Sequence, residues 1–316
     1  MKKLWHLGTM DMINTGDYKV KKILGSYKNG NYYVSILSDG SKIRSTNEDD
    51  FIPAFAESCD CKITDRCDGA CGFCYESCTP AGKHGDILNY KFLDTLHPYT
   101  EMAINGNDMT HPDLIPFLNL LKKKKVIANL TVNQIHFEKY QELIRKIVDD
   151  GLIYGLGVSL RNPTDDFVNL VKQYDNAVIH TIAGITSKND FEALYDKGLK
   201  ILILGYKGIG RGGLYQDSSS NWKMICKNTE WLYYNLSNMI SRFAVVSFDN
   251  KAIKQLDVNR IMGEKEWSQF YMGDDAQYTF YIDMVNGTFS KSSLTSDVER
   301  FPIMDSIDDM FARVRK

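Results

Sequence analysis

The sequence lacks the features that mark membrane, secreted and broadly basic nucleic-acid-binding proteins. No stretch approaches the ~20 continuous apolar residues of a transmembrane helix. The start, MKKLWHLGTMDMINTGDYKV, has no sustained apolar run of the kind a signal peptide carries. The net charge is only −2, so membrane and nucleic-acid partners are not expected. We therefore expect a protein of the reducing cytoplasm.

Long linkers and low-complexity segments are also absent from the 316 residues. A chain of this length buries a sizeable core without the disulfides that small secreted scaffolds need. In a reducing compartment, clustered cysteines more often indicate metal or redox chemistry than structural bridges.

The N-terminal segment, residues 1–56, reads as a small β-rich cap. Short strand patterns occupy residues 18–24, 31–37 and 41–46. Asn29-Gly30 and Asp39-Gly40 separate them, and both dipeptides are strong turn signals.

Residues 57–215 alternate strand patterns with helix patterns, which predicts repeated β/α units, an α/β fold class and a parallel sheet. The predicted strands are 61–64, 101–105, 126–132, 153–160, 177–185 and 199–206. The predicted helices are 111–123, 136–150, 164–174 and 187–198, the last with a capping signal at Ser187 and an end at Gly198. Six strands in series suit an open doubly wound sheet or a partial barrel, and both collect ligands at the carboxyl ends of their strands.

Residues 216–316 read as a C-terminal α+β extension. The pattern predicts a helix over 222–243, a strand and a helix over 244–256, and a closing helix over 306–316. A hairpin is expected around Asn286-Gly287.

Four of the seven cysteines lie in TDRCDGACGFCYESC, residues 64–78. Cys67, Cys71 and Cys74 form C-x3-C-x2-C, and three thiolates on one loop can hold three corners of a [4Fe-4S] cluster. The fourth iron then stays open for a ligand. Zinc is the alternative, with Cys61 or Cys78 as a fourth ligand, but the chain has no second C-x2-C pair.

This loop resembles the signature of the radical S-adenosylmethionine (radical SAM) superfamily. The spacing matches, Phe73 precedes the third cysteine, and a strand-like KIT precedes the loop. The resemblance implies a partial (β/α)6 TIM-like barrel over 57–215. It also implies SAM bound at the open iron, reductive cleavage of SAM, and a 5′-deoxyadenosyl radical that abstracts hydrogen from a substrate.

The resemblance also implies where SAM binds. Phe73 and Tyr75 would lie against the adenine. The second strand ends in Asn105, Gly106, Asn107 and Asp108, where the family usually has Gly-Gly-Glu to accept the SAM amine. Polar residues at later strand ends would contact the ribose and carboxylate, namely Asn133, Ser159 and Arg161.

The C-terminal layout resembles the SPASM/twitch-like subgroup, which modifies peptides, but no cysteine follows Cys226. A peptide or protein substrate is therefore expected, with a nucleotide or small metabolite as the alternative and a flavodoxin- or ferredoxin-type electron donor. The alternative from another class is a non-catalytic zinc- or iron–sulfur-binding module. Cys226 is either a hydrogen donor to a substrate radical or a small buried apolar side chain. We expect Cys59, Cys61 and Cys78 as free thiols near the mouth of the site.

A rival motif lies at 202–213, where Gly208, Gly210 and Gly213 satisfy G-x-G-x-x-G. A dinucleotide-binding fingerprint would open a helix here, but LYQDSSSN is a poor helix start. We therefore expect these glycines to turn the chain or to let the backbone approach a ligand closely.

Overall fold

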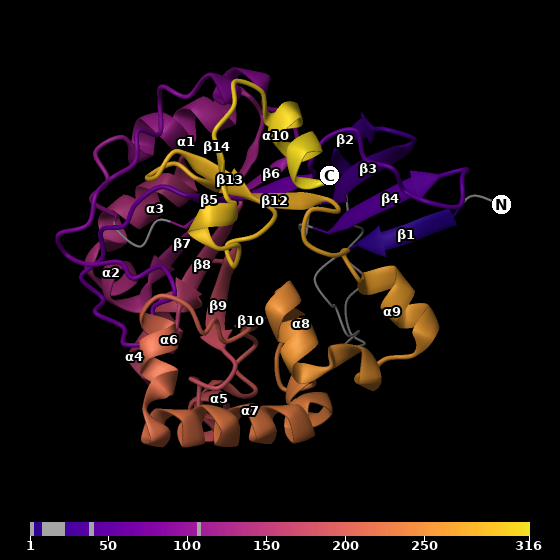
Figure 1. Ribbon diagram of the computed structural model, residues 1–316. Coiled ribbons are helices and arrows are strands. Elements are labelled where there is room, and N and C mark those ends of the chain that lie inside the picture. The colour runs from indigo at the N-terminus through magenta and orange to yellow at the C-terminus, as the bar shows by residue number, and fades with distance from the viewer. Residues whose placement is uncertain (1–2, 8–22, 38–40, 106–108) are drawn as a thin grey trace.

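The computed structural model describes residues 3–7, 23–37, 41–105 and 109–316, and its main feature is a ten-stranded sheet (Figure 1). Seven parallel strands lie side by side in chain order, with no reversal of the kind that defines a doubly wound sheet. They are β5 (Ser58–Lys62), β6 (Glu101–Asn105), β7 (Ile127–Asn133), β8 (Gly155–Ser159), β9 (Ala177–Ile182), β10 (Lys200–Leu204) and β11 (Val245–Phe248).

Helices follow these strands in the sequence, and Figure 1 shows α1 to α4 together on one side of the sheet. The helices that precede β10 are α1 (Leu114–Lys123), α2 (Gln134–Lys139), α3 (Gln141–Asp149), α4 (Asp165–Val171) and α5 (Lys188–Leu194). All six predicted strands and all four predicted helical regions are present, so the α/β class is confirmed.

Side chains alternate between the two faces of the strands, as the strand geometry requires. On β10, Ile201 and Ile203 are fully buried in the core, whereas Leu202 and Leu204 line a cavity on the other face. The same alternation on β6 buries Met102 and Ile104 and leaves Asn105 on the cavity side.

The C-terminal segment completes the sheet. β12 (Thr279–Asp283) pairs in parallel with β5, and β13 (Thr288–Ser290) and β14 (Phe301–Pro302) continue antiparallel. The hairpin at Asn286-Gly287 is confirmed, with Gly287 at φ +66°. The remaining helices are α6 (Arg211–Asp217), α7 (Ser219–Ile240), α8 (Asn250–Leu256), α9 (Glu264–Phe270) and α10 (Ile307–Val314), and the 3-10 turns are η1 (Lys91–Thr95), η2 (Val258–Ile261) and η3 (Asp297–Glu299).

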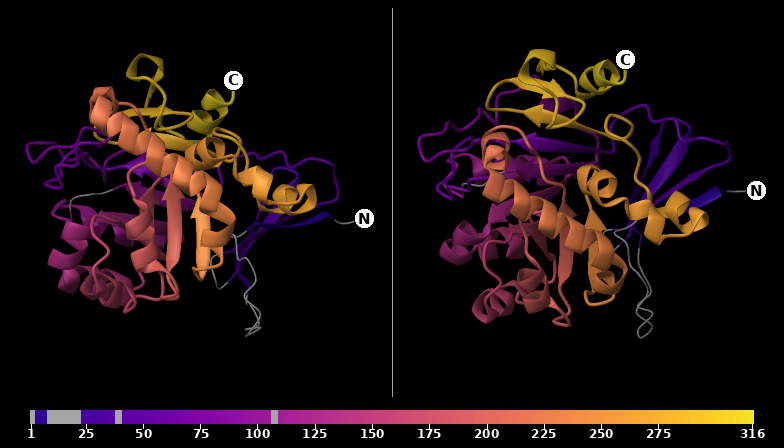
Figure 2. Two further views of the ribbon diagram at one scale, coloured as in Figure 1. Left: turned by 90° about the horizontal axis from the view of Figure 1, so that it is seen from below. Right: turned by 60° about the horizontal axis from the view of Figure 1, so that its bottom comes forward.

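The N-terminal strands form a separate antiparallel sheet beside the large one (Figure 2). Its order is β1-β4-β3-β2, from β1 (Lys3–Leu7), β2 (Ile23–Asn29), β3 (Tyr32–Leu37) and β4 (Lys42–Thr46). Arg44 and Tyr32 both donate to the buried Glu57 carboxylate, at 2.6 and 2.7 Å, which ties this sheet to the start of β5.

Two local features follow the sequence closely. The turn at Asn29-Gly30 joins β2 to β3, with Gly30 at φ +56°, while Asp39-Gly40 and most of 18–24 lie outside the described residues. Ser187 caps α5 in a reciprocal capping box with Asp190.

Two expectations about helix ends are wrong. Helix α5 ends at Leu194, ahead of Gly198, because Tyr195 already adopts an extended conformation. Helix α6 does begin at the glycine segment, at Arg211, although glycine is a weak helix former. In the described ranges, no helix is both long and apolar enough to cross a bilayer.

Candidate functional site

The cysteine loop leaves the carboxyl end of β5 and folds back on itself. The Cys67 amide donates to the Thr79 carbonyl at 2.9 Å, and the Thr79 amide donates to the Asp65 carbonyl at 3.0 Å. Cys67 is buried, and Cys71 and Cys74 are half-buried. The loop therefore presents its three spaced thiols from one closed backbone ring.

Hydrogen-bond donors surround two of these sulfurs. The Gly69 amide lies 3.3 Å from Cys67 Sγ, and Asn133 Nδ2 approaches the same sulfur at 3.6 Å. Arg161 Nη1 lies 4.0 Å from Cys71 Sγ and also donates to the Gly69 carbonyl. Such donors stabilise a negatively charged sulfur.

The protonation of the thiols reflects this mixed environment. Burial raises the pKa of Cys67 and of Cys71, while the nearby Arg161 guanidinium acts to lower the pKa of Cys71. A side-chain hydrogen bond with Cys78 lowers the pKa of Cys74 to about 6. Metal binding requires thiolates, which cationic neighbours and hydrogen-bond donors favour.

Helix α6 holds the loop from the other side. Arg211 donates from Nε to the Cys71 carbonyl at 3.2 Å and from Nη1 to the Cys78 carbonyl at 2.7 Å. Gly210 sits at φ +54°, and a Cβ there would stand 2.3 Å from the Tyr75 carbonyl oxygen. A Cβ on Gly212 would similarly lie 3.2 Å from the Phe73 carbonyl. The sequence predicted that these glycines let the backbone approach another group closely. In the structure, that group is the cysteine loop.

A cavity of about 280 Å³ lies beneath the loop, on the face of the sheet opposite the helices. It is bounded by side chains of the loop, of the strands β5 to β10, and of the segments that follow β10 and β11. The lining includes Phe73, Cys74, Tyr75, Asp60, Lys62, Asn105, Thr131, Ser159, His180, Leu202, Leu204, Lys207, Asp249 and Ser293.

The pKa values of three titratable groups in this cavity are displaced from their ordinary range. Desolvation raises the pKa of Asp60 to about 6, against the opposing charge of Lys207. Desolvation also raises the pKa of Asp249 and lowers that of His180 to about 4. The cavity therefore combines a neutral imidazole with a carboxyl group able to exchange a proton near neutral pH.

A buried ion network supports the loop from below. Lys62 Nζ lies 2.6 Å from Asp65, 2.9 Å from Glu76 and 3.4 Å from Asp283. Burial opposes the charge on Lys62, but these carboxylates raise its pKa overall. Arg300 also contacts Asp283, at 3.3 Å. The network links β5, the cysteine loop and β12.

The structure places the sequence-predicted residues in three groups. Phe73, Tyr75, Asn105 and Ser159 line the cavity. Asn133 and Arg161 contact the cysteine loop itself, and the Asn133 side chain also caps α2. The remaining three lie outside the described residues, namely Gly106, Asn107 and Asp108.

Three of the other four cysteines differ from expectation. Cys59 and Cys61 are buried in the core on β5, away from the mouth, where Cys61 Sγ lies 3.3 Å from the sulfur of Met284. Side chains two residues apart on a strand point to the same face of the sheet, and Cys59 and Cys61 both point to the face that the helices cover. Cys226 is exposed on α7 and lines a different pocket, so its reading as a buried apolar side chain is wrong. Cys78, by contrast, is a free thiol that is buried beside Cys74 and lines the cavity, close to the site as expected.

Sequence reasoning missed the charged groups of the cavity and the network. Asp60 and His180 are polar residues inside strands, at positions that alternate with buried ones; this was the available signal. In the described part of the chain, no three His, Cys, Asp or Glu side chains converge closely enough to hold a single metal ion. An iron–sulfur cluster carries its own irons and sulfides, so its ligands meet corners of a cube rather than one point.

No known family profile matches the chain, and neither does any curated protein. Solved structures do match. The peptide-bound structure of Streptococcus suis SuiB, with precursor peptide SuiA, aligns with a TM-score of 0.56 at 13% identity over 82% of this chain. SuiB bound to S-adenosylmethionine aligns with a TM-score of 0.55 at 14% identity over 84% of this chain.

The chain has the fold of SuiB. At this identity the likeness concerns the fold, and the chain spans 65% and 69% of the two SuiB chains. The α/β fold predicted from the sequence is therefore shared with SuiB.

Proposed function

We propose that this protein is a radical SAM enzyme that acts on a peptide. The observation that carries the proposal is a C-x3-C-x2-C loop standing over a cavity at the carboxyl ends of parallel strands. The similarity to SuiB, which has been solved with S-adenosylmethionine and with a precursor peptide, supports both parts.

The residues of the loop fit a [4Fe-4S] cluster held by Cys67, Cys71 and Cys74. Amide and guanidinium donors face two of the sulfurs, and the loop is pinned at both ends by backbone hydrogen bonds. Two of the three thiols are partly exposed, so a bound cluster would remain accessible to a further ligand. When bound, the cluster and SAM would supply a 5′-deoxyadenosyl radical by reductive cleavage, with an electron from a flavodoxin- or ferredoxin-type donor.

The chain's own residues would bind and orient SAM in the cavity. Phe73 and Tyr75 offer aromatic faces for adenine, and Ser159 offers a hydroxyl for the ribose. The stretch Asn105 to Asp108 offers carbonyl and carboxylate acceptors for the SAM amine. Arg161 has a guanidinium for the SAM carboxylate, and Asn133 supports the loop.

We also propose that the sequential parallel strands form a partial (β/α)6 barrel. Residues 57–215 would be its core, with 1–56 as a cap and 216–316 as an extension. In support, one cavity is lined by side chains from β5 through β10, which a sheet curved around that cavity would place together.

Anaerobic reconstitution with iron and sulfide tests this function. We expect about four irons per chain and brown absorbance, and 5′-deoxyadenosine after addition of dithionite and SAM. A variant with alanine at Cys67, Cys71 and Cys74 should lose both. Stoichiometric zinc in the purified protein, without SAM cleavage, would favour a non-catalytic metal-binding module.

Substrate class is tested separately. Short peptides encoded beside the gene should gain a mass shift in the complete reaction, whereas nucleotides and small metabolites should not. Modification of a metabolite alone would retain the chemistry and reject the peptide.

A further inference from the structure

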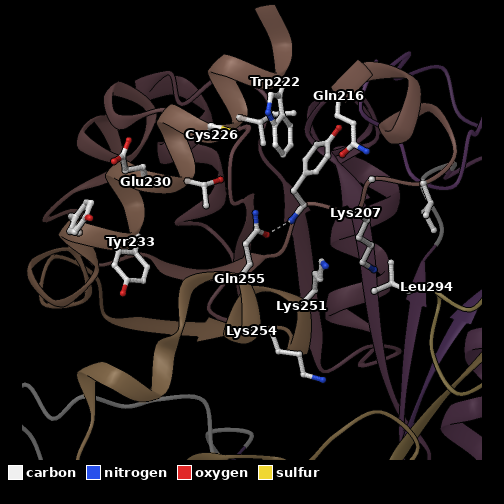
Figure 3. A pocket seen from close by; sticks show the side chains of 16 residues that line it. Lys207, Gln216, Trp222, Cys226, Glu230, Tyr233, Lys251, Lys254, Gln255 and Leu294 are labelled. Atoms are coloured by element: carbon white, nitrogen blue, oxygen red, sulfur yellow. Dashed lines mark hydrogen bonds between the residues drawn. The ribbon is translucent and has the colours of Figure 1, made fainter. Parts of the chain in front are cut away.

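A second and larger pocket, of about 850 Å³, opens beside the candidate site (Figure 3). Its walls are one face of α7, one face of α8, and the segment that follows β10. Helical spacing explains the two faces. On α7 the lining residues are Trp222, Ile225, Cys226, Thr229, Glu230, Tyr233 and Tyr234, and on α8 they are Lys251, Lys254 and Gln255.

Positive charge dominates one side of this pocket. Lys251 and Lys254 project from α8 and Lys207 from the segment after β10, whereas Glu230 on α7 lies across the pocket from Lys207 (Figure 3). Lys254 pairs with Asp274 at 3.1 Å. Lys251 has no carboxylate within ion-pair distance among the residues the structure describes, and it is exposed.

The backbone is shaped to hold Lys251 in this place. A Cβ on Gly205 would lie 2.4 Å from Lys251 Cγ, so only glycine at the end of β10 lets the lysine stem pack there. The Asp249 carboxylate accepts a hydrogen bond from the Ala252 amide at 2.7 Å. This N-cap fixes the first turn of α8, which carries Lys251. The ammonium is thus presented from an anchored stem.

Apolar surface accompanies the charge. Trp222 is 50% exposed and Tyr234 72% exposed, and both line the pocket together with Ile209. Large apolar side chains grouped at a pocket rim indicate a binding surface more often than scattered ones do.

The pocket adjoins the cavity under the cysteine loop. Tyr206 and Lys207 line both spaces. Ser293 lines the cavity, its neighbour Leu294 lines the pocket, and Lys207 Nζ donates to Ser293 Oγ at 3.0 Å between them. A chain seated in the pocket would therefore lie next to the proposed reaction space.

We propose that this pocket binds a segment of the substrate peptide that carries an acidic side chain beside an apolar one. The carboxylate would meet Lys251, with Lys254 close by, and the apolar residue would pack on Trp222. This inference rests on the proposed function, because the occupant is taken to be the substrate of the same enzyme.

Two capped peptides, LELEL and LQLQL, test the charge preference by tryptophan fluorescence or calorimetry at low salt. We expect LELEL to bind about tenfold more tightly, as one good charge-assisted contact would provide. Lys251→Glu should remove the difference. Lys223→Glu, an exposed lysine of α7 outside the pocket, is the matched control and should retain it.

Equal binding of the two peptides, no binding of either, or equal effects of the two lysine variants would overturn the inference. SAM cleavage without added peptide is measured in parallel, so the two proposals fail separately. If the protein forms 5′-deoxyadenosine but binds LELEL and LQLQL equally, only the proposed role of the pocket is rejected. If the protein prefers LELEL through Lys251 but does not cleave SAM, the preference of the pocket for acidic peptides is supported and the enzymatic function is rejected.

Discussion

Arg211 donates a hydrogen bond to the carbonyl of Cys78, a residue 133 positions earlier in the chain, at 2.7 Å. Together with its second bond, to the Cys71 carbonyl, this side chain spans the outer half of the cysteine loop. The shape of the loop is thus set partly by a helix that forms much later in the sequence.

Arg211→Ala should loosen the loop and lower its capacity for iron. Two hydrogen bonds from a charged donor disappear, and we expect a loss of about 2 kcal/mol in the free energy of unfolding. Iron per chain after reconstitution should fall by at least about twofold, and amide exchange should rise over residues 71–79. Arg242→Ala removes an exposed pair with Asp196 and should change none of these. Unchanged iron content in Arg211→Ala would show that the loop is rigid without this clamp.

Lys62→Met should be among the most destabilising single changes in the protein. It leaves the buried carboxylates of Glu76 and Asp283 without their shared cation. Breaking a buried pair typically costs about 3–5 kcal/mol, and denaturant unfolding measures it. Lys91→Met, which removes an ion pair whose side chains are both more than three-quarters exposed, should cost less than about 1 kcal/mol. Equal losses in the two variants would mean that the network contributes no more than a surface pair.

Single alanine substitutions should separate the cysteines by role. Cys67→Ala, Cys71→Ala and Cys74→Ala should each reduce bound iron severely, while Cys226→Ala should leave it intact because that thiol lies in the other pocket. If Cys226 donates hydrogen to a substrate radical, its variant forms 5′-deoxyadenosine but not the finished product. A Cys226→Ala enzyme with full product yield would eliminate that role.

Asp60→Asn should stabilise the folded protein above about pH 7. The folded-state pKa of Asp60 is raised from 3.8 to about 6 by desolvation, so the ionised carboxylate disfavours folding at neutral pH. As the pH falls through 6 toward 4, the wild-type protein takes up this proton in the folded state and the advantage of the variant shrinks. Thermal melting of both proteins across this range measures the difference. A constant difference at all pH values would show that Asp60 does not titrate there.

The sequence predicts the order of elements well because each strand and helix has its own spacing of apolar residues and its own residues that mark its ends. Ser187 with Asp190, and Asn29 with Gly30, are local patterns that the structure reproduces. The cysteine spacing is local too, so the C-x3-C-x2-C motif is read directly from residues 67–74.

The remaining features depend on residues distant in sequence. Helix α6 begins at Arg211 despite its glycines because Gly210 and Gly212 pack against the cysteine loop, and that tertiary contact outweighs a weak helical preference. The Lys62 network joins three separate segments, so no window of the sequence reveals it. The expected position of Cys61 near the mouth of the site is wrong, because its burial depends on which face of β5 the helices cover.

The pairing of β12 with β5 also affects how the protein is made. The strand that carries the cysteine loop is bordered on one side by residues 279–283, more than two hundred positions downstream. A ribosome must therefore release almost the whole chain before that edge is covered, and until then an unpaired strand and its thiols stay open to misassociation. We expect fragments that stop at residue 215 to aggregate during expression, and maturation with iron to follow completion of the chain.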